Sequence, residues 1–313
     1  MKIIVQPKGN KNFLATVIIG QNYLSDWEKF AFPLWNAYCI RHGLGLIIFD
    51  AELINIKDKF WKKANWQKML IGVEMIKNGL LDANVCYLDT DILISPFAPN
   101  LFNTYDKTCI ALVSEIKNLP FSLRLAQKRL AFLRHTRWSS EYPLDSALFK
   151  TPEDIFSYHG FQVFDDYACT GFFIFNTVNH SEMLSRWFNK YQSGIETITG
   201  GGEEPILNYE LLNWGKIQWY PYEFQALWIY EAAIKYPFIF DLNASSDLIK
   251  KCIEASLHSN HILHFAGSWN ECQMWKLENF FEEKETKEEV INFQNYLNKK
   301  ITGEAVGMIR PKN

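Results

Sequence analysis

The sequence has no excess of basic residues, no closely spaced cysteine pair and no long hydrophobic run. Lysine and arginine number 32 against 35 aspartates and glutamates, a formal net charge of −3, which argues against a nucleic-acid partner. The six cysteines include no CxxC pair, so we expect reduced thiols. The first residues lack the apolar core of a signal peptide, and no window reaches the length of a membrane span. We therefore expect a cytoplasmic protein.

What the sequence does contain is a regular alternation of apolar runs and helical patterns. Hydrophobic residues make up 48% of the chain, enough for a sizeable core. Apolar runs at 13–20, 44–50 and 84–94 are typical of buried strands, and the segments 25–43 and 64–79 between them have helical spacing. Strand–helix alternation of this kind predicts an α/β fold with a mostly parallel central sheet.

The pattern becomes less regular near residue 110, where we place a boundary within the domain. Segment 121–138 then carries basic residues and no acidic one. Its apolar residues recur near helical spacing, which predicts an amphipathic helix. One interpretation is a solvated face or lid, and the other is contact with an anionic membrane surface. From residue 276 the chain is charged, and we expect a helical tail over 276–313.

Two carboxylates interrupt the third apolar run, in "NVCYLDTDILIS". Asp89 and Asp91 would be costly to bury unless they were paired, hydrogen-bonded or bound to a metal. Ligands of parallel α/β sheets bind beyond the carboxyl ends of the strands, toward which these residues lie. Carboxylate oxygens suit Mg²⁺ or Mn²⁺. The alternative is a strand end whose two acids simply face solvent.

Two later segments carry further candidate site residues. "ILHFAG" places His264 at the end of an apolar run, where a neutral imidazole is a suitable third ligand for Mn²⁺, or an ordinary half-buried histidine. "GGGEEPILN" places Glu203 and Glu204 behind three glycines, which permit close backbone approach to a ligand. The alternative for these two acids is ordinary capping of a helix start.

Taken in order, these motifs resemble the GT-A glycosyltransferases. Within them they resemble glycosyltransferase family eight, the group of glycogenin and the bacterial lipopolysaccharide glucosyl- and galactosyltransferases. The resemblance covers roughly residues 13 to 270 and rests on the segments "IIGQNYL", "WQKML", "YLDTDILI", "ACTGFFIFNT", "GGGEEPILN" and "HFAGSW". It implies a GT-A, Rossmann-like fold, with residues 1–110 as the nucleotide-sugar-binding half and 111–275 as the acceptor and catalytic half.

The resemblance also implies a reaction and a set of site residues. The reaction is metal-dependent transfer of a hexose from UDP-glucose or UDP-galactose to a carbohydrate or glycolipid acceptor, with retention of anomeric configuration. Mn²⁺, or Mg²⁺, would be held by Asp89, Asp91 and His264. The implied donor-binding residues are Gly20, Gln21, Tyr23, Lys68, Asp89, Thr170, Gly171, Asn176 and Gly267. Glu203 and Glu204 would be the catalytic carboxylates beside the transferred sugar.

Two departures from the family pattern keep other functions open. The family's Asp-Gln pair is Glu203-Glu204 here, and the lysine of its "HFxGxxKPW" segment is missing. Lys276 or a basic residue of 124–137 is a candidate substitute. A non-catalytic sugar-nucleotide-binding relative therefore remains an alternative, as does a nucleotidyltransferase, although the chain has no basic glycine-rich loop after its first strand. A haloacid-dehalogenase-type phosphatase is disfavoured, because its DxD motif normally lies on the first strand.

Overall fold

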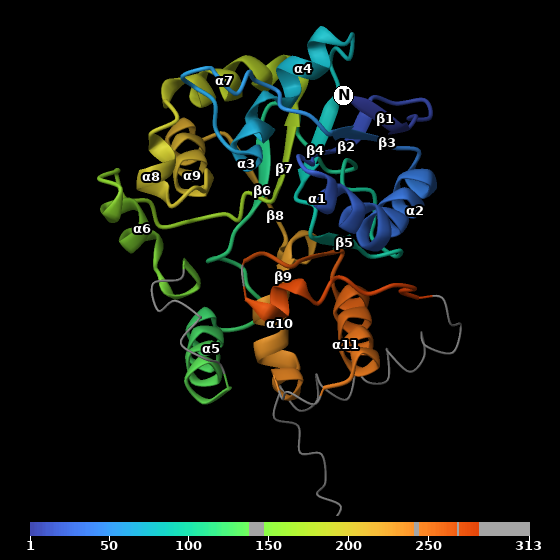
Figure 1. The fold of residues 1–313 in the computed structure, drawn as a ribbon, viewed down its shortest axis with the longest axis vertical. Coiled ribbons are helices and arrows are strands. Elements are labelled where there is room, and N and C mark those ends of the chain that lie inside the picture. The colour runs from blue at the N-terminus through green and yellow to red at the C-terminus, as the bar shows by residue number, and fades with distance from the viewer. Residues whose placement is uncertain (138–146, 241–243, 268, 282–313) are drawn as a thin grey trace, which may run out of the picture.

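The computed structural model describes residues 1–137, 147–240, 244–267 and 269–281. A seven-stranded sheet crosses the molecule in the order β1-β3-β2-β4-β7-β6-β8 (Figure 1). Its strands are β1 (Lys2–Val5), β2 (Asn12–Val17), β3 (Gly45–Phe49), β4 (Asn84–Leu88), β6 (Ile110–Val113), β7 (Phe172–Asn176) and β8 (Ile217–Tyr220). A second, three-stranded sheet has the order β5-β10-β9, formed by β5 (Ile92–Ile94), β10 (Ile262–His264) and β9 (Ala226–Leu227).

The central sheet is predominantly parallel. Strand β2 pairs in parallel with β3 and β4, and β6 pairs in parallel with β8. Strand β7 runs antiparallel to its neighbours β4 and β6, and β1 runs antiparallel to β3. Thus β2, β3, β4, β6 and β8 share one direction, which confirms the expected α/β, Rossmann-like fold class. The reversed β7 was not anticipated, and it determines the layout of the site.

Helices cover both faces of the sheet. The α-helices of the described residues are α1 (Gln21–Asp26), α2 (Phe32–His42), α3 (Ala64–Gln67), α4 (Ile71–Lys77), α5 (Leu123–Arg137), α6 (Pro152–Tyr158), α7 (Thr177–Lys190), α8 (Ile195–Thr199), α9 (Glu204–Trp214), α10 (Trp228–Lys235) and α11 (Ser246–Ser259). Figure 1 shows α4 and α7 together at one end of the molecule, while α5, α10 and α11 lie at the other. None of the described helices is long and apolar enough to cross a membrane.

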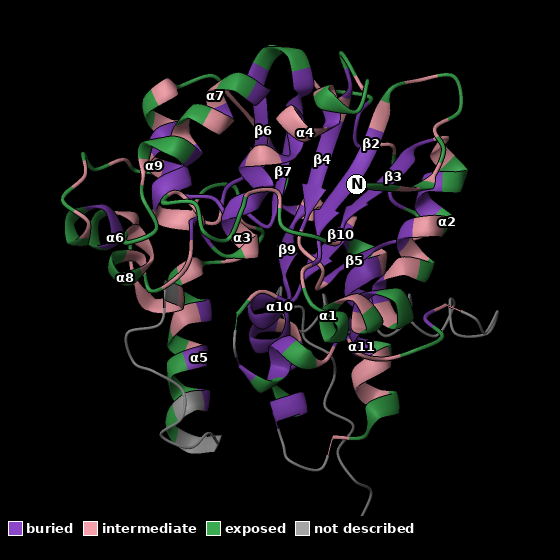
Figure 2. Ribbon diagram, turned by 45° about the horizontal axis from the view of Figure 1, so that its top comes forward, coloured by how far each residue is buried: buried purple, intermediate pink, exposed green. Residues whose placement is uncertain are grey.

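The core follows the two-residue period of the strands. Leu14 and Cys86 belong to the apolar cluster on one face of the sheet, whereas Ala15 and Val85 belong to the cluster on the other. Figure 2 shows that the central strands are buried along their length. Because both faces are covered, the strands read as continuous apolar runs, which is why they were recognisable in the sequence.

Two local expectations are corrected. The first helical segment begins at Gln21 rather than near Ser25, because Gly20, with φ of 113°, turns the chain directly out of β2. It passes through a π-helical turn (Trp27–Ala31), and Pro33 is accommodated in the first turn of α2. In the predicted tail, residues 276–281 form no helix, and 282–313 lie outside the described residues.

Candidate active site

The site begins where β4 ends and β7 begins. Because β7 is antiparallel to β4, the residues just before β7 lie beside those just after β4. Leu88 pairs with Phe172, and the backbone N–H of Asp89 donates to the carbonyl of Gly171 at 2.8 Å. The "YLDTD" and "ACTG" segments, distant in sequence, therefore form one edge of the site.

The small sheet brings His264 to the same place. His264, the last residue of β10, pairs with Ile92 of β5, and the N–H of Phe265 donates to the Asp91 carbonyl at 3.1 Å. The His264 Nε2 atom lies 3.3 Å from Asp91 Oδ1 and 3.8 Å from Asp89 Oδ2. Ligand atoms of the three residues lie within 4.8 Å of one another.

Burial and charge–charge interactions act against each other on the pKa values of this cluster. Burial alone would lower the pKa of His264, but the adjacent Asp91 and Asp89 carboxylates raise it overall. Burial would raise the pKa of Asp91, yet the His264 ring and its hydrogen bond lower it. The pKa of Asp89 is raised, chiefly by burial and against the opposing effect of Lys68.

The donor set fits a hard divalent cation. Two carboxylates and one imidazole are ligands accepted by Mn²⁺, and the acids are about a third exposed, which leaves coordination positions for a ligand. The cradle is also shaped for close approach. A Cβ atom on Gly171 would lie 2.2 Å from His264 Cε1 and 2.7 Å from Asp89 Oδ2, so no larger residue fits there without displacing both.

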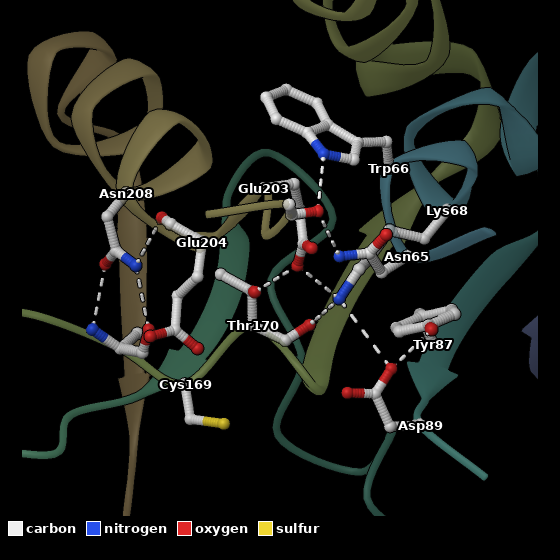
Figure 3. Close-up of polar contacts among 12 residues, drawn as sticks. Asn65, Trp66, Lys68, Tyr87, Asp89, Cys169, Thr170, Glu203, Glu204 and Asn208 are labelled. Atoms are coloured by element: carbon white, nitrogen blue, oxygen red, sulfur yellow. Dashed lines mark hydrogen bonds and ion pairs between the residues drawn. The ribbon is translucent and has the colours of Figure 1, made fainter. Parts of the chain in front are cut away.

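A buried ion pair adjoins the cluster. Lys68, in the 3₁₀ turn after α3, is 1% exposed and its Nζ lies 2.6 Å from Glu203 Oε1 and 3.7 Å from Asp89 Oδ1. It also donates to the carbonyl of Thr170 at 2.8 Å, and the Thr170 hydroxyl donates to the same Glu203 oxygen at 2.6 Å (Figure 3). Lys68 is therefore engaged within the protein, with its ammonium directed at Glu203.

Glu204, the first residue of α9, has a different environment from Glu203. One turn further on, the Asn208 amide exchanges two 2.8 Å hydrogen bonds with the backbone of Ala168, which fixes α9 against the segment before β7 (Figure 3). Glu204 carries no ion pair among the described residues, and burial, followed by repulsion from Glu203, raises its pKa to about 7. Tyr167 hydrogen-bonds to its carboxylate.

The glycine-rich loop is tied to α3. The side chains of Asn65 and Trp66 both donate to the carbonyl of Gly201 at 3.2 Å, and the backbone N–H of Lys63 donates to Glu196 at 2.9 Å. Gly201, with φ of +95°, occupies a backbone conformation that favours glycine. These bonds hold the loop over the Lys68–Glu203 pair.

Three neighbouring cavities surround the cluster. A cavity of about 400 Å³ is lined by Tyr23, Lys63, Asp89, Asp91 and Trp275, among others. A larger cavity of about 1030 Å³ shares Lys63, Asp89 and Asp91 with it and extends past the glycine-rich loop. A third, of about 230 Å³, shares Glu204 and Tyr167 with the large cavity and has mostly apolar walls. The metal-ligand candidates thus lie between two cavities, and Glu204 lies between the second and the third.

Most, but not all, of the expected site residues are brought together. The large cavity is lined by Lys68, Asp89, Asp91, Thr170, Glu203, Glu204, His264 and Gly267. Tyr23 lines the 400 Å³ cavity, whereas Gly20 and Gln21, at the start of α1, line none of the three described cavities.

The expectation for Asn176 is wrong. It ends β7 at the opposite edge of the sheet, paired with Asn84 at the start of β4, where its side chain caps α7. The reversed strand direction carries it away from the site.

Several residues of the site were missed. Lys63 and Asn65 line both larger cavities, and the position of Asn65, one helical turn before Lys68, could have indicated it. Tyr87 donates to Asp89, and the Gln225 amide lies 3.1 Å from His264 Nδ1. Gln225 follows no motif, so no sequence signal pointed to it.

The sequence matches no protein-family model and no curated protein. Among solved structures it is similar to a glycosyltransferase involved in the glycosylation of the major capsid of PBCV-1, at 9% identity over 85% of this chain and 97% of that chain, with a TM-score of 0.44. It is also similar to WbbM, a bifunctional glycosyltransferase, at 12% identity over 94% of this chain and 52% of that chain, with a TM-score of 0.47. GlyE, a glycosyltransferase of Streptococcus pneumoniae TIGR4, shows 13% identity over 94% of this chain and 64% of that chain, with a TM-score of 0.42. At these identities and TM-scores the similarity carries no conclusion about the chemistry of this chain.

Proposed function

We propose that the chain is a metal-dependent glycosyltransferase that transfers a hexose from a nucleotide-sugar to a carbohydrate or glycolipid acceptor. UDP-glucose or UDP-galactose is the proposed donor, and Mn²⁺ or Mg²⁺ the cation. The observation that carries the proposal is the Asp89–Asp91–His264 cluster at the boundary between two cavities. This layout suits a molecule with a diphosphate between a nucleoside and a sugar.

The smaller cavity suits the nucleoside. It lies mostly among residues of the first 91, in agreement with the proposed nucleotide-binding role of 1–110, and offers the rings of Tyr23 and Trp275 to a base. A cation bound by the cluster would stabilise the negative charge of the departing diphosphate. Lys63 lines both cavities and adds positive charge at their junction. Lys276 also lines this cavity, where it pairs with Asp26 at 2.8 Å.

The two glutamates have separate roles in this proposal. Glu203 is 4% exposed and one of its oxygens already accepts from Lys68 and Thr170, so it positions the site and holds Lys68. Glu204 faces two cavities without a cationic partner among the described residues. With a pKa of about 7 it can accept a proton near neutral pH, or stabilise positive charge at the anomeric carbon. Retention of configuration is part of the proposal through the family resemblance.

The third cavity is the proposed acceptor position. Apolar side chains such as Ile155, Leu227 and Tyr230 can pack against a sugar ring, while Glu115 and Glu204 can accept hydrogen bonds from its hydroxyl groups. Because Glu204 also borders the large cavity, a hydroxyl bound here reaches the donor sugar next to the proposed proton acceptor.

The test is a donor screen with and without Mn²⁺. Thermal shift and nucleotide release would be measured over a panel of nucleotide-sugars, for the wild type, Asp91→Ala and a control, Asp165→Ala, whose side chain is 91% exposed. We expect one UDP-sugar to stabilise the wild type and the control in a metal-dependent way, with slow hydrolysis, and Asp91→Ala to lose both effects. No stabilisation by any nucleotide-sugar would refute the donor site. Binding without turnover on any acceptor would instead favour the non-catalytic alternative.

A peripheral membrane contact through 121–138 also stands as a proposal. The expected amphipathic helix is present as α5, but its apolar stripe of Ala126, Leu130 and Leu133 is buried in the core. The opposite face carries exposed Leu125 and Phe132 together with basic residues, a composition suited to an anionic surface. Co-sedimentation with anionic but not neutral liposomes is expected, and equal absence from both would remove the membrane contact.

A further inference from the structure

The His264 ring is held from behind by a buried amide. Its Nδ1 atom lies 3.1 Å from Gln225 Nε2 and 3.4 Å from Cys169 Sγ, on the side of the ring away from the two aspartates. Gln225 is 2% exposed. Nothing in the proposed chemistry so far requires a residue of this type at this place.

The backbone fixes where this amide lies. Gln225 follows a 3₁₀ turn (Tyr222–Phe224), and its N–H donates to the Tyr222 carbonyl at 2.9 Å. The next residue, Ala226, starts β9, which pairs in parallel with β10 so that Leu227 lies opposite His264. The amide is thus set against the ring by two paired strands, and only its terminal torsion is free to exchange oxygen and nitrogen.

That exchange matters because a neutral imidazole carries one N–H hydrogen. A cation can bind Nε2 only when the hydrogen is on Nδ1, which then needs an acceptor behind it. With the amide nitrogen facing Nδ1, the hydrogen belongs on Nε2, where it points at Asp91 Oδ1, 3.3 Å away. With the amide oxygen facing Nδ1, Nε2 is left with a free lone pair. The two orientations of Gln225 correspond to an imidazole that donates to Asp91 and one that can ligate a metal.

A second observation shows that the present orientation is incompletely satisfied. Gln225 Oε1 is buried and accepts no hydrogen bond from any described residue, which is unfavourable for a buried polar atom. The small void lined by Gln225 and Glu115 leaves no volume for a water molecule that could bond to it. Rotation of the amide would give Oε1 the Nδ1–H group as donor.

We propose that Gln225 selects the tautomer of His264, rotating its amide to accept from Nδ1–H when a divalent cation binds Nε2. Gln225 is then a positioning residue for the metal ligand, and the inference rests on the proposed metal site. It makes the amide rotation part of metal binding itself.

The test compares three substitutions by their Mn²⁺ affinity, measured by electron paramagnetic resonance without any nucleotide-sugar. Gln225→Met keeps the shape but cannot accept, so we expect a 10- to 100-fold loss of affinity. Gln225→Glu is an acceptor only, so it should retain wild-type affinity within a few-fold. Gln218→Met, on β8 outside the three cavities, is the matched control and should bind as the wild type does.

A second readout reports on the tautomer directly. In ¹⁵N spectra of the wild type with Mg²⁺, the His264 ring should carry its hydrogen on Nδ1. In the metal-free protein, at a pH where the ring is neutral, the hydrogen should be on Nε2. Unchanged Mn²⁺ affinity in Gln225→Met, with His264→Ala weakened, would overturn the role of Gln225 while leaving the metal site intact. A wild type that binds no Mn²⁺ would overturn both. Thermal melts of each apo variant separate loss of affinity from loss of fold.

Discussion

Replacement of Lys68 by methionine tests the buried ion pair at the centre of the site. The substitution keeps the length of the side chain and removes its charge. Glu203, 4% exposed, would then lose a cation 2.6 Å away and retain only the Thr170 hydroxyl, while the Thr170 carbonyl would lose a 2.8 Å donor. Removing one partner of a buried pair typically costs about 3–5 kcal/mol. Asp89, 3.7 Å from Nζ, would also lose a favourable interaction, which its one-third exposure to solvent weakens.

The measurement is the free energy of unfolding from urea denaturation, made without metal. Lys29→Met is the control, since the Lys29–Glu278 pair has the same 2.6 Å separation but both side chains are more than half exposed, and its loss should cost less than about 1 kcal/mol. The double variant Lys68→Met/Glu203→Gln should be more stable than the sum of the single losses predicts, by about 1–3 kcal/mol. A Lys68→Met variant within 1 kcal/mol of the wild type, or strictly additive losses, would refute the reasoning.

Two further predictions concern the cradle and Glu204. Gly171→Ala places a methyl group 2.2 Å from His264 Cε1, so Mn²⁺ affinity in a titration should fall at least roughly tenfold. Gly194→Ala is the control and should leave the affinity unchanged, because apart from its chain neighbours no described atom lies within 4 Å of the added methyl group. Equal affinities of the two variants would contradict the close approach at Gly171. Burial raises the pKa of Glu204 from 4.5 in the unfolded chain to about 7 in the folded protein. Protonation of Glu204 therefore stabilises the fold fully below pH 4.5, and this stabilisation is lost as the pH rises through 7. As the pH is raised from 5 to 8, the free energy of unfolding of Glu204→Gln should therefore increase by roughly 2–3 kcal/mol relative to that of the wild type. Parallel curves of unfolding free energy against pH for the two proteins would contradict this.

The features predicted correctly from sequence are those with strong local signals. Strands β2, β3 and β4 are predominantly apolar because both sheet faces are covered. Asp89 and Asp91 stood out because carboxylates are rare at the end of such a run. The proximity of His264 to them followed only from the family resemblance, since it depends on the pairing of β5 with β10.

What could not be predicted depends on strand direction and on residues without a motif. The resemblance of "ACTGFFIFNT" to a family segment predicts Asn176 in the site, but the length and composition of a strand do not say which way it runs between its neighbours. The reversal of β7 moves its two ends to opposite edges of the sheet. Gln225 and Tyr87 contact site residues through tertiary packing alone, and the π-helical turn before Pro33 reflects local packing that periodicity does not encode.

The pairing of β5 with β10 has a thermodynamic consequence. Asp89 and His264 are far apart along the chain, so the cation site cannot exist until the last described strand has joined the small sheet. Such non-local pairing forms slowly, because a long loop must close before any contact compensates for its entropy. A divalent ion that binds the completed fold and not the unfolded chain would add to the stability of the domain through mass action, by an amount that rises with its free concentration. On the proposed function, metal availability would then affect the stability of the fold as well as the rate of turnover.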